Sequence, residues 1–156
     1  MDIDAMYLRN GDLTVRLYDD FITLSCDEEQ EKTEFEAKLS VELENTKRRS
    51  VLISGGRIRI SSGKNYVIKR ISELRSSPIE LGAGMRKAHT LRFTVAPSDC
   101  ARLGIRNQGE TEAPITCSLE LYDTDRQKHV AATVGISIYA KGDLLRIIEE
   151  STKKNL

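Results

Sequence analysis

Hydrophobic residues alternate with polar residues along most of the chain, which is the pattern of β-strands with one buried and one solvated face. The longest example runs from Phe35 to Leu43, where every second residue is apolar and the residues between are Glu, Lys or Ser. The pattern predicts seven or eight strands. The other segments are 13–18, 21–25, 51–60, 65–71, 90–95, 115–121 and 130–138.

Turn-forming residues separate these segments. Loops are expected at 61–65 and 81–84, and a hairpin at 123–128 joins the last two long strands. Within 51–60 the apolar positions change from odd to even numbers at Gly55-Gly56. Such a change predicts a β-bulge, whose extra residue turns the following side chains to the other face of the strand.

Two short helices are predicted outside the strands. Residues 97–104 begin with Pro97, have Ser98 or Asp99 as the expected N-cap, and end at Gly104. Residues 143–150 carry an apolar stripe, and the tail 151–156 is expected to be frayed.

The strand pattern and the small helix content favour an all-β, antiparallel two-sheet sandwich over an α/β fold. A closed β-barrel is the alternative, which the uneven strand lengths and the long connection 72–88 disfavour. Because no repeat or linker interrupts the chain, residues 1–156 are expected to form a single domain.

The segment 39–53 resembles part of the bacterial immunoglobulin-like sandwich domains. It contains a long strand that ends in Asn45, a turn with the basic pair Arg48-Arg49, and a returning strand. The glycine turn in 79–84 extends the resemblance, which covers roughly 35–140. The resemblance implies an immunoglobulin-like fold and, because a fold hosts many functions, implies none in particular. It departs from the family pattern at Lys47, where Gly is common, and at Ala83, where Pro is common.

Composition indicates a globular chain in a reducing compartment. With 156 residues, 39% of them hydrophobic, the chain can build a core without disulfides. The acidic start Met1-Asp2 is unlike a signal peptide, and no run of 18 apolar residues occurs. Cys26, Cys100 and Cys117 are too few and too irregular for a disulfide framework. We therefore expect a cytoplasmic protein with no membrane partner.

The net charge of zero conceals a strong segregation of charge along the chain. Residues 1–45 have 13 acidic and 4 basic residues, a charge of −9, whereas 46–79 have 9 basic and 1 acidic, a charge of +8. Residues 80–156 have a charge of +1. We expect the first two blocks to become neighbours, so that much of the charge cancels across strands.

Clustered cations can bind acidic proteins or phosphate groups. The more economical interpretation is that Arg57 and Arg59 pair with Glu36, Glu42 or Glu44 across neighbouring strands. For function, the sequence favours a non-enzymatic protein-binding or scaffolding module, or one that self-associates, with loops 61–65 and 123–128 as subsidiary contacts. The predicted partner-binding residues are Lys47, Arg48, Arg49, Arg57, Arg59 and Lys64.

Two other classes of function stay open. A nucleic-acid accessory protein would use the same basic surface, although only Tyr66 in that block offers a base-stacking surface. A small hydrolase or thiol enzyme would need His89 or His129 beside a nucleophile. Cys117 alternates with core residues, whereas Cys100 lies on a capped turn that would lower its pKa. The spacings match no phosphate loop or metal site, so we predict no catalytic residue, cofactor or metal.

Overall fold

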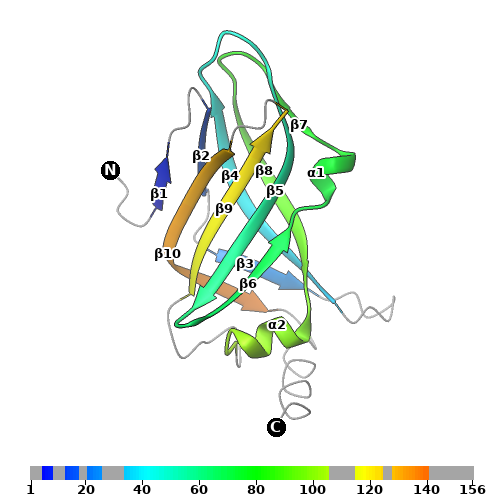
Figure 1. Ribbon diagram of the computed structural model, residues 1–156, viewed down its shortest axis with the longest axis vertical. Helices are drawn as coiled ribbons and strands as arrows, with labels where there is room; N and C mark the ends of the chain where they lie inside the picture. The colour runs from blue at the N-terminus through cyan, green and yellow to red at the C-terminus, as the bar shows by residue number, and fades with distance from the viewer. Residues whose placement is uncertain are drawn as a thin grey trace.

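A computed structural model describes residues 5–8, 13–17, 21–25, 34–105, 115–124 and 128–140, which form two β-sheets packed face to face (Figure 1). The described elements are β1 (Ala5–Leu8), β2 (Leu13–Leu17), β3 (Phe21–Ser25), β4 (Phe35–Asn45), β5 (Val51–Ser62), β6 (Asn65–Arg70), α1 (Glu73–Ser76), β7 (Ile79–Leu81), β8 (Arg86–Val95), α2 (Pro97–Arg102), β9 (Ile115–Asp123) and β10 (Lys128–Ala140).

The first sheet has the order β1-β10-β9-β5, with β6 and β7 end to end along the outer edge of β5. In the second sheet β8 pairs with β4, and β2 and β3 lie end to end along the other edge of β4. Strand β10 joins the sheets, because its last residues, Ser137–Ala140, pair with β3 in parallel. The other pairings between described strands are antiparallel. The fold is therefore an all-β two-sheet sandwich, as the alternation predicted.

The eight predicted strands are all present, and two short strands, β1 and β7, were not predicted. Helix α1, inside the long connection 72–88, was also missed. The predicted helix 143–150 and the tail 151–156 lie outside the described residues. Within the described ranges, no helix has the length and apolar character needed to cross a membrane.

Helix α2 confirms the predicted helix at 97–104, but its N-cap is Ala96, not Ser98 or Asp99. Asp99 lies one turn inside, where its Oδ2 accepts a hydrogen bond of 2.9 Å from the backbone N–H of Ala96. The carboxylate therefore satisfies a terminal N–H of the helix from the N3 position rather than from the cap itself. Gly104, with a φ of 69°, ends the turn as predicted.

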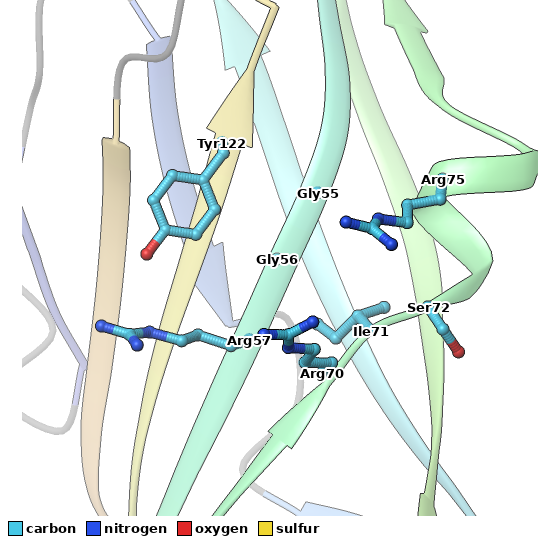
Figure 2. Close-up of a pocket in the computed structure, with 8 residues that line it drawn as sticks. All are labelled: Gly55, Gly56, Arg57, Arg70, Ile71, Ser72, Arg75 and Tyr122. Carbon is cyan, nitrogen blue, oxygen red and sulfur yellow. The ribbon is translucent and has the colours of Figure 1, made fainter.

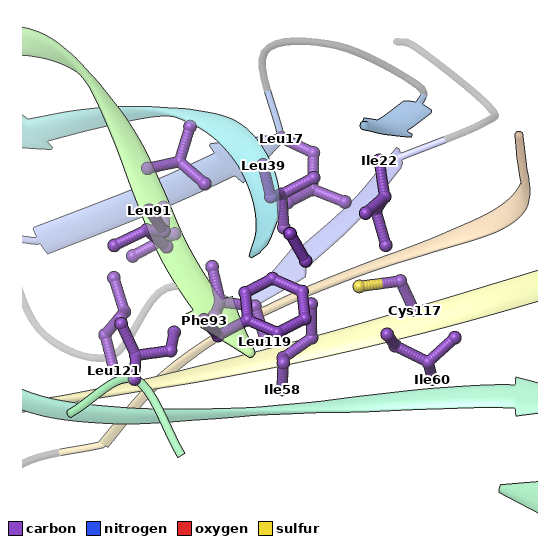
Figure 3. Packing of buried hydrophobic residues seen from close by; sticks show 14 of the residues in the cluster. Leu17, Ile22, Leu39, Ile58, Ile60, Leu91, Phe93, Cys117, Leu119 and Leu121 are labelled. Carbon is purple, nitrogen blue, oxygen red and sulfur yellow. The ribbon is translucent and has the colours of Figure 1, made fainter. Parts of the chain in front are cut away.

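Burial follows the alternation closely. In β4, every odd-numbered residue from Phe35 to Asn45 is buried, and the residues between them are partly or fully exposed. Figure 3 shows the inward side chains of the two sheets meeting, with Leu39 and Phe93 opposite Cys117 and Leu119. Cys117 is 2% exposed, so the prediction that it belongs to the core is confirmed.

The predicted bulge at Gly55-Gly56 is confirmed, since the register of β5 against β9 shifts between Ile53 and Gly55. A Cβ on Gly56 would point into the core, 2.8 Å from Cδ2 of Leu121 and 3.1 Å from the backbone oxygen of Glu120. A Cβ on Gly55 would meet nothing within 4 Å. The two glycines therefore have opposite surroundings, one crowded and one open.

Asn45 is a fully buried polar residue at the end of β4. Its Nδ2 donates to the carbonyl oxygens of Arg49 at 2.9 Å, Leu81 at 3.0 Å and Gly82 at 3.2 Å, and its Oδ1 accepts from the N–H of Lys47 at 2.9 Å. One side chain thus holds the loop between β4 and β5 against the turn between β7 and β8, and its burial is compensated by these hydrogen bonds.

Gly56→Ala is expected to lower the free energy of unfolding by about 1–3 kcal/mol, because the new methyl group must displace core atoms. Gly55→Ala is the matched control and should change that energy by less than about 0.5 kcal/mol. Urea denaturation of the two variants measures both values. Equal effects at the two positions would contradict the assigned orientation of the glycines.

Asn45→Asp is expected to destabilise the protein by about 1–3 kcal/mol or more, because a carboxylate cannot donate to the carbonyl oxygens that the amide contacts. Asn65→Asp changes an exposed asparagine on β6 in the same way and serves as the control. Thermal and urea unfolding should separate the two variants clearly, and a neutral Asn45→Asp would show that the network contributes little.

Candidate functional site

The acidic side chains of β4 pair with β8 and not with β5. Arg86 lies 3.5 Å from a carboxylate oxygen of Glu42 and 3.0 Å from one of Glu44, and Arg92 lies 3.7 Å from Glu36. The expected pairing of these glutamates with Arg57 or Arg59 is therefore wrong. The physical reason is that the loop 46–50 carries the chain from one sheet to the other, so that β4 and β5 are not neighbours in a sheet.

The basic side chains of β5 have other partners. The Nε of Arg57 donates to Oε2 of Glu120 on β9, and the hydroxyl of Tyr122 donates to the same oxygen at 2.7 Å. These hydrogen bonds raise the pKa of both Arg57 and Tyr122. The guanidinium of Arg59 lies 4.2 Å from the ring centroid of Tyr66, a cation–π contact.

The six predicted partner-binding residues do not form one surface. Lys47, Arg48 and Arg49 lie in the loop before β5, and Lys64 lies in the turn after it, a hairpin turn formed with Gly63. Because β5 has 12 residues, the two loops are separated by about 35–40 Å at roughly 3.3 Å per residue. Arg57 and Arg59 lie between these ends, on the outward face of β5.

A groove of about 350 Å³ lies where the bulge interrupts β5 (Figure 2). Its position follows from the strand order: β7 pairs with β5 only up to Ile53 and β6 only from Arg57, which leaves 54–56 facing α1. The N–H of Ile71 donates to the carbonyl of Gly56 at 2.9 Å and fixes the segment that enters α1. The groove is lined by Gly55, Gly56, Arg57, Arg70, Ile71, Ser72, Arg75 and Tyr122.

The groove carries an excess of positive charge. Arg70 and Arg75 form no ion pair with any described residue, whereas the nearby Glu120 is already engaged by Arg57 and Tyr122. Glu73 of α1 accepts a hydrogen bond of 2.9 Å from the backbone N–H of Arg92 on β8. Glu120 is therefore engaged elsewhere, and Glu73 is oriented toward β8 by this hydrogen bond and forms no ion pair with Arg70 or Arg75.

Next to the groove, the outward face of the β5–β6 hairpin combines apolar and basic side chains. Tyr66 and Ile68 on β6 are each 47% exposed, and register places Ile68 opposite Arg59 and Arg70 opposite Arg57. We call this set, namely Arg57, Arg59, Tyr66, Ile68 and Arg70, the hairpin face. Aromatic residues and arginine are enriched at protein interfaces, and Ile68 adds exposed apolar area beside them.

The described thiols are not nucleophiles at neutral pH. Cys100 is fully buried, and burial raises its pKa to about 12, so the expectation that its helix lowers the pKa is wrong. Burial also raises the pKa of Cys117 to about 12. Cys26 lies outside the described residues.

The two histidines lie on β8 and β10, where partial burial lowers the pKa of His89. In the part of the chain that the structure describes, no three His, Cys, Asp or Glu side chains come together as a metal site.

The groove contains residues that the sequence did not single out, namely Ser72 and Tyr122. Arg70 and Arg75 belonged to the basic block, but nothing in their spacing indicated that they face Gly55 and Gly56. The sequence signal that could have located the groove was the Gly55-Gly56 pair, where the apolar positions change from odd to even. A bulge without side chains leaves space beside a strand.

No family model matches the sequence, and no curated protein does. Solved structures with similarity include the ycdA protein of Bacillus subtilis, with a TM-score of 0.47 and 11% identity over 92% of this chain and 41% of that one. A protein from Archaeoglobus fulgidus has a TM-score of 0.46 and 11% identity over 83% of this chain and 87% of that one. The chain spans less than half of the Bacillus subtilis protein.

In a Cys26→Ser background, Cys100 and Cys117 should resist labelling by an aromatic disulfide reagent at pH 8. A shift of the thiol pKa from 9.0 to about 12 lowers the thiolate fraction about a thousandfold, and burial restricts access further. The ratio of labelling rates in buffer and in guanidinium chloride measures this protection. Fast labelling of either cysteine in the native state would contradict its assigned burial.

Proposed function

We propose that this chain is a non-enzymatic binding module that docks an acidic segment of another protein on the hairpin face. The observation that carries the proposal is the exposure of Tyr66 and Ile68 beside Arg59 and Arg70 on two adjacent strands. Burying these side chains against a partner would supply the apolar area, and the arginines would select negative charge.

The charge distribution supports an acidic partner. The hairpin face has three arginines, and only Arg57 among them has an ion-pair partner in the described ranges. An arginine that stacks on an aromatic ring, as Arg59 does on Tyr66, keeps its fork of N–H donors available for a carboxylate. A partner with aspartate or glutamate beside an apolar residue matches both features.

The exposed apolar side chains of the hairpin face favour a protein partner over nucleic acid. Tyr66 offers a ring for stacking, but Arg59 already covers it, and the neighbouring Ile68 is aliphatic. Single-stranded nucleic acids are bound by aromatic side chains on which successive bases stack. Nucleic-acid binding is therefore an outcome that the test below has to exclude.

The wider predictions from the sequence are consistent with this proposal. The likeness of 39–53 to immunoglobulin-like domains concerns the fold and favours no function. A cytoplasmic location agrees with the free thiols of Cys100 and Cys117. Of the other predicted contacts Lys64 alone adjoins the hairpin face, and the docking surface proposed here does not include Lys47, Arg48 or Arg49. A second copy of the chain, offering its acidic residues, is one form that the protein partner could take.

The test is selection of ten-residue peptides from a random library on the purified chain, followed by fluorescence polarisation with the selected peptides. Acidic peptides with an apolar residue should be enriched. Arg59→Glu and Tyr66→Ala should each weaken their binding about tenfold or more, because each removes a central contact. Arg48→Glu reverses an exposed charge at the far end of β5 and should leave the affinity unchanged.

Three results would overturn the proposal. They are selection without acidic preference, equal losses in Arg59→Glu and Arg48→Glu, and tighter binding of a single-stranded oligonucleotide that weakens steeply with salt. The last result would favour the nucleic-acid accessory function. Unchanged circular dichroism and melting temperature must accompany each variant.

A further inference from the structure

We infer that the groove between β5 and α1 is an anchor site for one oxyanion, the carboxylate or phosphate of a side chain, held by Arg70 and Arg75. The inference rests on the proposed function, since it assigns the groove to a charged side chain of the acidic segment that docks on the adjoining hairpin face. The groove shares Arg57 and Arg70 with that face, and its six other lining residues lie outside the face.

Convergence of two arginines is the first argument. Arg70 ends β6 and Arg75 lies in α1, and Figure 2 shows both side chains directed from that side toward β5 at Gly55–Arg57. Arg57 extends the other way, past the hydroxyl of Tyr122. The groove thus receives guanidinium groups from two different elements, the arrangement that binds carboxylate or phosphate through paired N–H donors.

Unbalanced charge is the second argument. Like charges that face one space repel each other, and an anion between them removes that cost. Among the described residues, no carboxylate forms an ion pair with Arg70 or Arg75, and Glu120 is engaged by Arg57 and Tyr122. A carboxylate or phosphate of another molecule would supply the negative charge that the described residues do not provide here.

The shape of the groove is the third argument. A volume of about 350 Å³ exceeds what a bare ion needs and lies at the lower end of the range for small-ligand pockets. Gly55 contributes no side chain, and a Cβ there would meet nothing within 4 Å. An amino-acid side chain with its charged end group fits such a space, which Ser72 and Tyr122 also line.

The experiment is an NMR titration of the isotope-labelled chain with inorganic phosphate and, separately, with acetate, at ionic strength held constant with sodium chloride. Saturable shifts should centre on the amides of Gly55, Gly56 and Ser72. Arg70→Gln and Arg75→Gln should each weaken binding about tenfold, as expected for loss of a hydrogen bond to a charged group. Gly55→Leu should weaken it as strongly while leaving every charge in place.

Arg48→Gln is the matched control and should change the affinity less than twofold. Binding of phosphate alone would identify a phosphorylated ligand, and binding of both ions a general oxyanion site, and either result supports the inference. Shifts that do not saturate, or that Arg48→Gln weakens equally, would overturn it.

The same variants separate this inference from the proposed function. If acidic peptides bind the hairpin face but Arg75→Gln and Gly55→Leu leave their affinity unchanged, the anchor fails and the binding module stands. If the ions bind and no acidic peptide does, the proposed function fails and the groove is a site for a free anion.

Discussion

The bulge at Gly55-Gly56 is the constraint on which the candidate site depends. Gly56 must lack a side chain because Leu121 and Leu74 occupy the space where its Cβ would be. The interruption also divides the outer edge of β5 between β7 and β6, and α1 lies in the interval. A groove at mid-strand is therefore a consequence of packing in the core, and the arginines beside it are held by a strand end and a single helical turn.

Charge in this protein is balanced through tertiary neighbours. Glu42 and Glu44 of β4 are matched by Arg86 on β8. Arg57 and Lys69 of the 46–79 block are matched by Glu120 on β9 and Asp99 on α2. These partners, Arg86, Glu120 and Asp99, belong to the 80–156 block, whose own charge is close to zero. Arg70 and Arg75 are outside this pairing, which gives the outer face of the first sheet its positive character.

The buried polar and thiol groups show how burial alone changes chemistry. Asn45 is fully buried and keeps its hydrogen bonds, so it stabilises two turns at one end of the sandwich. Cys100 and Cys117 are buried among apolar side chains, which favours the neutral thiol. Burial thus makes the asparagine a structural residue and the cysteines unreactive. The exposed arginines are the groups that are available to bind another molecule.

The sequence by itself determined the strands, the all-β class, the bulge and the core position of Cys117, because these depend on local alternation and on glycine. It missed β1, β7 and α1, which are three or four residues long and stabilised by neighbours rather than by their own pattern. Only the tertiary structure decided which charges meet. Alternation says which residues point outward, but the order of strands in the two sheets decides that Arg57 meets Glu120 and that Arg70 and Arg75 share a groove.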